Sequence, residues 1–290
     1  MEQRRVIALG FFDGVHRGHQ AIIRTASRLA QEQGLQSAAV TFETHPRAYI
    51  FGRAPELISS FERRCIRLQQ AGAALVIALP FDRQMAETSP EEFAALLREQ
   101  YRASAVVCGE NFRFGTRASG KPQDFERFGL ETHIVPPVTY GKRVVSSTYI
   151  RECVREGKVG LAGRLLGDPF TLEGSIIGGF QVGRTLGYPT GNLRVDPGIL
   201  LPRRGVYITE VAVGEGSFRA VTNVGTRPTF TDADIVSVES YLLDFHGDLY
   251  GKQAQVRFLK YLRPEREFSD RDALRAQIAK DIELALAYRR

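Results

Sequence analysis

The sequence predicts an α/β domain with a parallel sheet and helices on both faces, followed by a small antiparallel β-barrel that a C-terminal helix closes. Three observations predict this fold class. The first half alternates short apolar runs with amphipathic segments, as parallel α/β sheets do. The second half, from Phe170, is dominated by strand-like runs with glycine or proline turns. The 290 residues suffice for two domains, which we place at 1–167 and 168–290.

The elements of the first domain follow from its apolar runs and helix-start signals. Strands are expected at Val6–Leu9, Ser37–Phe42, Ala74–Leu79, Ser104–Cys108 and Thr132–Val135. Helices are expected between them, at His19–Gln33, Phe61–Gln70 and Pro90–Tyr101. The third helix has the best-marked start, because Ser89 can cap it, Pro90 suits its first position and Glu92 stands three residues after the cap.

The second half begins with two short helices and continues as strands. The helices are expected at Thr148–Glu156 and Leu161–Leu166, before the chain-breaking Gly167-Asp168-Pro169. Gly214-Glu215-Gly216 predicts a hairpin, and strands are expected at Val206–Val213, Ser217–Val224, Val236–Phe245 and Ala254–Tyr261. A final helix follows Ser269, since Leu274, Ile278 and Ile282 recur every fourth residue along one face.

Composition and charge narrow the class of protein. The chain is 43% hydrophobic and 25% charged, so packed cores are expected. The net charge of +6 suits phosphate-bearing substrates, and it equally suits simple solubility. The sequence has no run of five or more like charges, so no nucleic-acid partner is predicted.

Cysteine usage and the N-terminal residues predict a cytoplasmic protein. Cys65, Cys108 and Cys153 include no CxxC pair, which argues against a disulfide framework or a zinc site and suits a reducing compartment. The apolar run Val6–Phe12 resembles a signal sequence, but Asp13 ends it early and no small-residue cleavage site follows. No run approaches the roughly 18 apolar residues of a membrane span, so no membrane partner is expected.

The first candidate site directly follows the first predicted strand. The motif reads Gly10-Phe11-Phe12-Asp13-Gly14-Val15-His16-Arg17-Gly18-His19. His16 and His19 stand three residues apart, on one face of a helix start whose N–H groups and dipole favour anions. Gly14 and Gly18 allow the main chain to approach a phosphate. The alternatives are an incomplete metal site or ordinary polar residues, although no HExxH motif or plausible third ligand is present.

The second candidate site lies in the barrel half. No GxxxxGK[ST] motif occurs, which excludes a P-loop kinase. The segment from Gly183 to Asn192 is instead expected to form a tight turn in which Thr190 and Asn192 offer oxygen atoms, the ligands that Mg²⁺ takes. The alternative is a purely structural β-turn, because glycine, proline and asparagine are common turn formers.

The first half resembles the FMN adenylyltransferase half of bacterial-type bifunctional FAD synthetases, in the nucleotidyltransferase superfamily. The resemblance rests on the motif at Gly10–His19, on Thr41–Arg47 with its F-x-x-H-P pattern, on Gly109–Gly115, and on Ser146–Arg151. It implies a nucleotidyltransferase-like sheet and phosphate stabilisation by His16 and His19. Its implied ATP- and phosphate-binding residues in this half are Gly10, Phe11, Asp13, Gly14, His16, His19, Ser147 and Arg151. Its implied flavin-binding residues are His45, Pro46 and Asn111.

The second half resembles riboflavin kinase, a β-barrel enzyme. The matching segments are Gly183–Asn192, Val238–Phe245, Asn223–Phe230, Asp248–Gly251 and Leu262–Phe268. The resemblance implies that Glu239 is the catalytic base, that Thr190 and Asn192 hold Mg²⁺, that Gly183 and Thr190 contact ATP, and that Arg263 contacts flavin. Three residues depart from the family pattern, since Gly191 replaces an alanine and Tyr241 and Gly178 stand where histidine is common.

Together the two resemblances imply an enzyme that converts riboflavin to FMN and FMN to FAD, with ATP and Mg²⁺ at two separate sites. One alternative is an FMN adenylyltransferase whose barrel binds flavin with weak or silent kinase activity, because all three departures fall in the barrel. Another alternative is a non-enzymatic flavin-binding regulator on the same fold, against which the intact His16, His19, Thr190, Asn192 and Glu239 argue.

Overall fold

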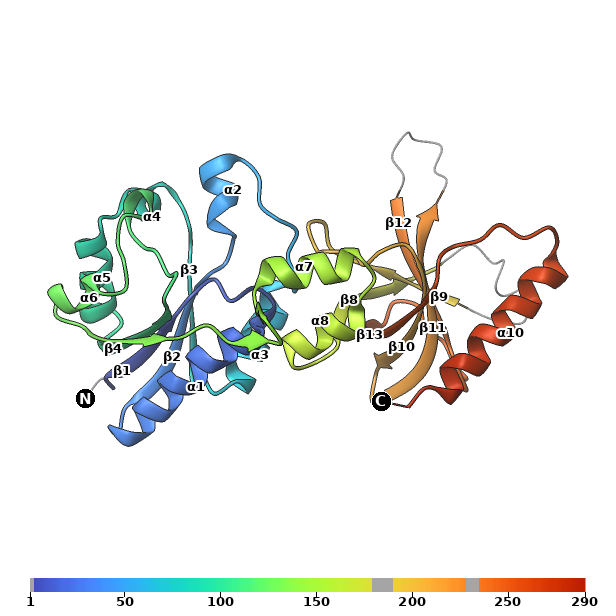
Figure 1. Ribbon diagram of the computed structural model, residues 1–290, viewed down its shortest axis with the longest axis horizontal. Coiled ribbons are helices and arrows are strands. Elements are labelled where there is room, and N and C mark those ends of the chain that lie inside the picture. Colours follow the sequence, from blue (N-terminus) through green and yellow to red (C-terminus); the bar gives the residue numbers. More distant parts are fainter. Residues whose placement is uncertain (1–2, 179–189, 228–234, 290) are drawn as a thin grey trace. The chain divides into compact units, whose positions relative to one another are not determined.

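The computed structural model describes residues 3–178, 190–227 and 235–289 (Figure 1). The chain divides into two compact units, Met1–Ser147 and Thr148–Arg290. The division falls after residue 147 rather than after residue 167, where the sequence suggested it.

The earlier division has a packing reason. Two short helices, α7 (Ser147–Arg155) and α8 (Val159–Leu166), precede the barrel, and α8 packs on strands of that barrel. The backbone carbonyl of Val154 in α7 accepts a hydrogen bond of 3.2 Å from the N–H of Arg203. Residues 148–166 therefore belong to the same compact unit as the barrel.

The first unit is a five-stranded sheet with the order β3-β2-β1-β4-β5, and every neighbouring pair is parallel. The strands are β1 (Arg5–Leu9), β2 (Gln36–Phe42), β3 (Leu75–Leu79), β4 (Ala103–Gly109) and β5 (Glu131–Val135). The helices are η1 (Asp13–Val15, a 3-10 turn), α1 (Arg17–Glu32), α2 (Pro46–Phe51), α3 (Phe61–Gln70), α4 (Arg83–Glu87), α5 (Pro90–Glu99), η2 (Thr116–Ala118) and α6 (Asp124–Arg127). A two-stranded hairpin, β6 (Thr139–Tyr140) and β7 (Arg143–Val144), ends the unit.

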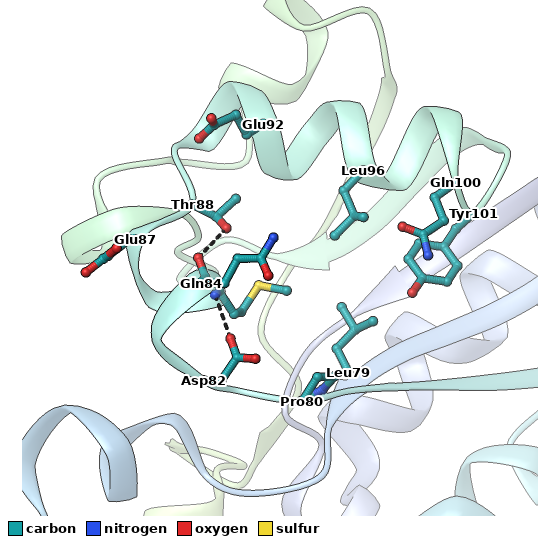
Figure 2. A pocket seen from close by; sticks show the side chains of 11 residues that line it. Leu79, Pro80, Asp82, Gln84, Glu87, Thr88, Glu92, Leu96, Gln100 and Tyr101 are labelled. Carbon is teal, nitrogen blue, oxygen red and sulfur yellow. Dashed lines mark hydrogen bonds between the residues drawn. The ribbon is translucent and has the colours of Figure 1, made fainter.

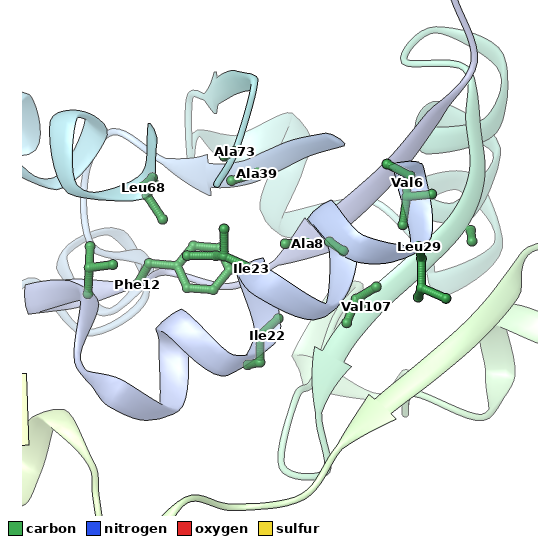
Figure 3. Close-up of a cluster of buried hydrophobic side chains, with 14 residues drawn as sticks. Val6, Ala8, Phe12, Ile22, Ile23, Leu29, Ala39, Leu68, Ala73 and Val107 are labelled. Atoms are coloured by element: carbon green, nitrogen blue, oxygen red, sulfur yellow. The ribbon is translucent and has the colours of Figure 1, made fainter. Parts of the chain in front are cut away.

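The two faces of this sheet are covered by different helices. Alternating residues of β1 point to opposite faces. Val6 and Ala8 pack with α1 and α3 (Figure 3), whereas Ile7 and Leu9 pack with α5 and α6. Both clusters are buried, which confirms the predicted α/β layers with helices on both faces. The order of strands reverses between β1 and β4, and ligands in open α/β sheets bind at the carboxyl ends of strands at such a point.

The second unit is a closed antiparallel barrel with the order β10-β11-β12-β9-β8-β13. Its strands are β8 (Phe170–Ile177), β9 (Thr190–Arg194), β10 (Gly205–Val213), β11 (Gly216–Arg227), β12 (Ile235–Leu242) and β13 (Gln253–Arg263). The helix α10 (Arg271–Ala287) packs through Ile282 and Ala285 on outward-facing residues of the barrel, which confirms the predicted closing helix.

One predicted turn proves to be a strand. The residues Thr190 to Asn192 belong to β9, which pairs with β12 on one side and with β8 on the other. The Pro-Thr-Gly-Asn composition favours a turn locally, but pairing on both edges outweighs this weak preference.

The helices and the cysteines bear on two further expectations, membrane crossing and disulfide bonding. Within residues 3–178, 190–227 and 235–289, no helix combines the length and the apolar character that a membrane span requires. Cys65, Cys108 and Cys153 are free thiols.

Candidate functional site

The turn between β1 and α1 is held in an unusual conformation. Phe12 has φ of 60°, Gly14 of 73° and Val15 of 42°, so three of its residues are left-handed and two of them are not glycine. Phe12, Asp13, Gly14 and Val15 are all buried. Such strain persists only where the surroundings impose it, and it is found most often at functional sites. A glycine at position 14 thus suits the left-handed backbone of this turn, and its approach to a phosphate stays a prediction.

The two histidines stack on each other at the start of α1. The ring centroids of His16 and His19 lie 3.5 Å apart with an interplanar angle of 19°. His16 is the N-cap of α1, and its Nδ1 accepts a hydrogen bond of 3.3 Å from the backbone N–H of His19. A Cβ at Gly18 would lie 3.1 Å from Cε1 of His16, so the glycine makes room for the imidazole.

The charge state of His19 follows from its surroundings. Burial, then the neighbouring His16, and then Arg64 hold the pKa of His19 well below its usual 6.5. Its ring is consequently neutral at neutral pH. Its Nδ1 is buried and has no hydrogen-bond partner among the described residues. A neutral imidazole carries one N–H donor, which can donate a hydrogen bond to a phosphate oxygen in the cleft.

A cleft of about 330 Å³ opens beside this pair. The predicted site residues that line it are Gly10, His16, His19, Asn111 and Ser147. These come from the carboxyl ends of β1 and β4 and from the start of α7, so the cleft lies at the point where the strand order reverses. Its other walls, which sequence reasoning missed, are mostly apolar and include Val135–Val138, Val144 and Val145.

Ser147 joins the wall of the cleft to the turn before α1. It is the first residue of α7. The Ser147 hydroxyl donates a hydrogen bond of 3.1 Å to the backbone carbonyl of Asp13. It thereby ties the wall of the cleft to the turn that carries the histidines.

Several predicted site residues do not line this cleft. The Asp13 carboxylate is buried and accepts the backbone N–H of Ile58 at 3.0 Å, which makes it a structural support. The His45 imidazole caps α2 by accepting the N–H of Arg47 at 3.1 Å, and its ring lies 4.4 Å from that of Phe11. Pro46 is the first residue of α2. Arg151 is a buried residue of α7 and belongs to the second unit.

A buried arginine near this turn was missed in the sequence. Arg64 is 2% exposed and donates hydrogen bonds to the backbone carbonyls of Phe11, Phe42 and Glu43. The sequence does contain an indication that Arg64 is buried, because this residue interrupts the apolar stripe that Phe61 and Leu68 define on α3.

The barrel residues come together through strand register. Asn192 on β9 pairs with Glu239 on β12, and Asn223 on β11 pairs with the same Glu239 from the other side. Directly opposed residues share a face, with Cβ atoms about 5 Å apart. Thr190 is two positions from Asn192 and so lies on the same face. The structure thus brings Thr190, Asn192 and Glu239 together; Gly183 lies outside the described residues.

Asn192 has the properties of a ligand residue. It is 2% exposed, and both its Oδ1 and its Nδ2 are buried without a partner among the described residues. A buried amide costs free energy when unpaired, so a partner that the structure does not contain is expected. An oxygen donor with a second donor from Thr190 nearby fits the oxygen preference of Mg²⁺.

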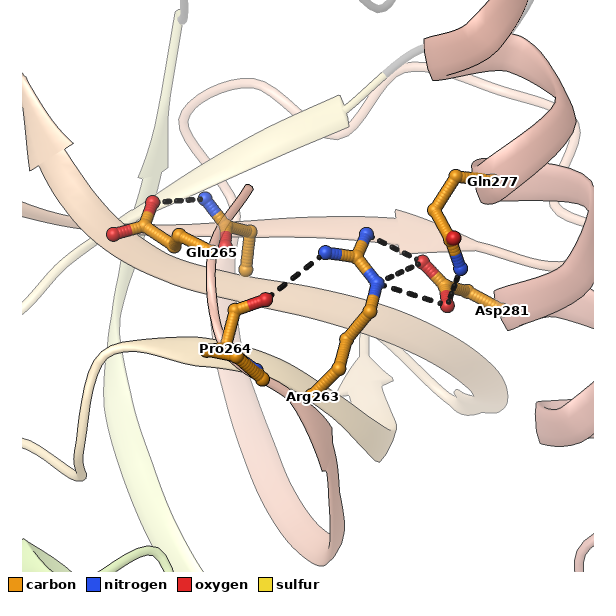
Figure 4. Close-up of polar contacts among 6 residues, drawn as sticks. Arg263, Pro264, Glu265, Gln277 and Asp281 are labelled. Carbon is orange, nitrogen blue, oxygen red and sulfur yellow. Dashed lines mark hydrogen bonds and ion pairs between the residues drawn. The ribbon is translucent and has the colours of Figure 1, made fainter. Parts of the chain in front are cut away.

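Arg263, the predicted flavin contact, is engaged elsewhere. Its Nη2 lies 2.7 Å from Oδ2 of Asp281, and its Nε donates to both oxygens of that carboxylate (Figure 4). Gln277 donates to the same carboxylate at 3.0 Å. Asp281 is 2% exposed, and a buried carboxylate needs a cationic partner. Arg263 therefore attaches α10 to the end of β13, and its contact with flavin stays a prediction.

The structure explains two of the three departures from the family pattern. A Cβ at Gly191 would lie 2.9 Å from a methyl carbon of Ile176, so isoleucine fills the space that alanine would use. Tyr241 packs in the cluster beneath α10, near Ile208 and Ile282. Nothing in the structure explains Gly178.

A larger groove of about 620 Å³ lies between α4 and α5, and none of the predicted site residues lines it (Figure 2). Its polar groups serve local structure. Asp82 caps α4, Glu92 completes the capping box of α5, and the Thr88 hydroxyl donates to the carbonyl of Gln84. The groove therefore presents no converging polar groups for chemistry.

The depressed pKa of His19 predicts how the stability of the first unit depends on pH. Because the folded pKa lies below the unfolded value of about 6.5, the unfolded state binds a proton first as the pH falls. The free energy of unfolding should therefore decrease below about pH 6.5. Thermal unfolding of this unit between about pH 5 and 8 should show a shallower decrease for His19→Gln. The exposed His246→Gln in the second unit is the control, and equal slopes for wild type and His19→Gln would contradict the assignment.

Both halves of the chain match families of known proteins. A family model described as FAD synthetase matches residues 1–149, and one described as riboflavin kinase matches residues 166–289. A bifunctional riboflavin kinase/FMN adenylyltransferase of Listeria monocytogenes is 35% identical over 282 residues, which is 96% of this chain and 90% of the relative. A protein of the same description from Bacillus subtilis is 34% identical over 99% of this chain and 93% of its own length. The Escherichia coli protein of that description is also 34% identical, over 95% of this chain and 90% of its own length.

A solved structure matches over the whole chain. The crystal structure called a macrolide-efflux protein from Streptococcus pneumoniae has a TM-score of 0.93 and 32% identity, and the match covers 100% of this chain and 96% of that one. The fold and the two family matches define a transferase with a nucleotidyltransferase-type sheet and a kinase barrel. The chain belongs to the bifunctional riboflavin kinase/FMN adenylyltransferase family. The predicted family and the predicted pair of activities are thereby confirmed.

Proposed function

We propose that this chain phosphorylates riboflavin to FMN in its barrel unit and adenylylates FMN to FAD in its α/β unit, with ATP and Mg²⁺ at two separate sites. The observation that carries the proposal is that each unit's own topology gathers one set of residues. His16 and His19 meet at the cleft of the first unit, and Asn192 and Glu239 are opposed across two strands of the second.

In the α/β unit, a phosphate oxygen of FMN attacks the α-phosphorus of ATP. The bond from that phosphorus to the bridging oxygen breaks, and pyrophosphate leaves. The reaction needs no protein nucleophile, so alignment and charge stabilisation suffice. His16 and the neutral His19 are placed to donate hydrogen bonds to phosphate oxygens as charge develops. The N-terminus of α1 adds N–H groups and a favourable dipole.

Asn111 and Ser147 complete the proposed first site. Both line the cleft, Asn111 from the loop after β4 and Ser147 from the start of α7. We assign Asn111 to the flavin and Ser147 to the triphosphate. The apolar wall at Val135–Val138 suits the isoalloxazine ring, because aromatic ligands are bound mainly by apolar contact.

In the barrel unit, Glu239 accepts the proton of the riboflavin 5′-hydroxyl while that oxygen attacks the γ-phosphorus of ATP. ADP leaves as the bond between the γ-phosphorus and the bridging oxygen breaks. Thr190 and Asn192 would hold Mg²⁺, which neutralises phosphate charge when it is bound. The buried and unpartnered oxygen of Asn192 supports this role.

A single assay tests the whole proposal. Purified protein is mixed with riboflavin, ATP and Mg²⁺, and FMN and FAD are resolved over time. FMN should appear first and FAD after it, and a chelator should stop both. FAD made only from supplied FMN would show a silent kinase, and flavin binding without turnover would show a regulator; either result contradicts the proposal. The cytoplasmic location stays a prediction from the free cysteines.

A further inference from the structure

Arg64 on α3 is a charged side chain that the fold has buried. It is 2% exposed, and it occupies the helix face whose other members, Phe61 and Leu68, are apolar. A fully buried arginine is rare, because its charge must be compensated by hydrogen bonds or a partner. The contacts of its guanidinium group therefore indicate the role of this buried charge.

The acceptors of Arg64 are backbone carbonyls at the ends of two neighbouring strands. Its Nη1 donates to the carbonyl of Phe11 at 3.0 Å, just beyond β1. Its Nη2 donates to the carbonyls of Phe42 and Glu43, at 2.8 and 3.0 Å, at the end of β2. Hydrogen bonds from an ionised donor are about twice as strong as neutral ones. The guanidinium therefore acts as a bracket across the carboxyl edge of the sheet.

The rings around Arg64 strengthen this bracket. Its guanidinium carbon lies 4.2 Å from the centroid of the Phe11 ring and 5.2 Å from that of Phe61. The Phe11 carbonyl also accepts the hydroxyl of the buried Thr41 at 2.9 Å. Phe11 is thus held through both its ring and its carbonyl.

Phe11 leads directly into the strained turn that carries the histidines. The left-handed residues Phe12 and Val15 follow it, and such residues need support from their surroundings. The Asp13 carboxylate within this turn accepts the backbone N–H of Ile58 at 3.0 Å, just before α3. One segment, Ile58 to Arg64, thus holds the turn at two points, and neither residue lines the cleft.

We propose that Arg64 is a positioning residue of the adenylyltransferase site, which sets the turn at Phe11–Val15 and thereby the placement of His16 and His19. The inference rests on the function proposed above. It concerns a residue that does not touch the substrate and acts only through the backbone of this turn.

The test compares Arg64→Met with Arg64→Lys and with the control Leu68→Ala, in the full-length chain. Leu68 is 0% exposed and lies one turn further along α3, so its truncation loosens the same helix without touching the carbonyls. The quantities measured are kcat and KM for FMN adenylylation, the melting temperature of the α/β unit, and riboflavin kinase activity as an internal control for folding.

We expect Arg64→Met to lower the adenylylation kcat by about 100-fold, since a misplacement of about 1 Å costs that much. Kinase activity should not change. Arg64→Lys should lose less activity than Arg64→Met, because its ammonium group can still donate hydrogen bonds. It should not reach the wild-type kcat, because it lacks the planar fork of the guanidinium group. Leu68→Ala should lower the melting temperature while keeping kcat at temperatures where the unit is folded.

Rescue by a small molecule separates positioning from general destabilisation. Arg64→Ala is assayed with and without millimolar ethylguanidinium, which should restore adenylylation several-fold but leave Leu68→Ala unaffected. A wild-type kcat for Arg64→Met, or a loss that merely follows the unfolded fraction as in Leu68→Ala, would overturn the inference. An inactive wild-type adenylyltransferase would instead refute the proposed function.

Discussion

Replacing Glu239 by Gln should nearly abolish FMN formation while leaving adenylylation of supplied FMN at the wild-type rate. The amide keeps the size of the side chain but cannot accept the hydroxyl proton. A positioned general base contributes roughly 10²- to 10⁴-fold, so a loss of that order in the kinase kcat is expected. Glu239 lies between Asn192 and Asn223 on neighbouring strands, so the isosteric change should preserve the barrel. The measurement is separate initial rates for riboflavin phosphorylation and FMN adenylylation.

The matched control is Glu215→Gln, which removes an exposed carboxylate from the β10–β11 turn of the same unit. Both of its activities should equal those of the wild type. A positioned base contributes at least about 100-fold. If the kinase kcat of Glu239→Gln stayed within about tenfold of wild type, Glu239 would not be the catalytic base. Loss of both activities in folded Glu239→Gln protein would argue against two separate sites.

The position of Asn192 supports the same assignment of the barrel site. Its amide is buried and unpartnered among the described residues, and its oxygen is the proposed ligand of Mg²⁺. Its position opposite Glu239 places the proposed base and the proposed metal ligand on one face of the sheet. This arrangement follows from the register alone, because residues paired across antiparallel strands always share a face.

The sequence was sufficient for most of the sheet in the first unit. The predicted strand Val6–Leu9 became Arg5–Leu9, and the helix Phe61–Gln70 was right at both ends. Short apolar runs and clear caps carry this information locally, so no knowledge of tertiary contacts was needed. The strand β9 was missed because Thr190, Gly191 and Asn192 follow a proline in a sequence that favours a turn. Its pairing with β12 and β8 depends on distant parts of the chain.

The site was predicted less completely than the fold. The motif around His16 and His19 located the cleft, since position after the first strand is readable from sequence. The hydrogen bonds of Asp13 and Arg263 could not be predicted, because their partners, Ile58 and Asp281, are distant in the sequence or on another element. A motif shows which residues a family keeps together, but it does not separate those that face the ligand from those that support the loop.

The largest effect on the other activity is expected when both His16 and His19 are replaced by Ala. Removing one preorganised hydrogen-bond donor typically costs about 10²- to 10³-fold in kcat, and neighbouring donors are not additive. FMN adenylylation should therefore fall by at least about 10³-fold, whereas riboflavin phosphorylation should continue and FMN should accumulate. The rates of both reactions and the accumulated FMN are measured in the same assay.

His16 needs a design that separates its two tasks, because it also caps α1 through its Nδ1. Losing a cap costs about 1 kcal/mol, and asparagine is among the best cap residues. His16→Asn should therefore keep the melting temperature of the α/β unit and still lose adenylylation, whereas His16→Ala should lose both. His133→Ala on β5, outside the cleft, should change neither activity. Full adenylylation by His16→Asn would reduce His16 to a helix cap and would leave His19 alone to stabilise the phosphate.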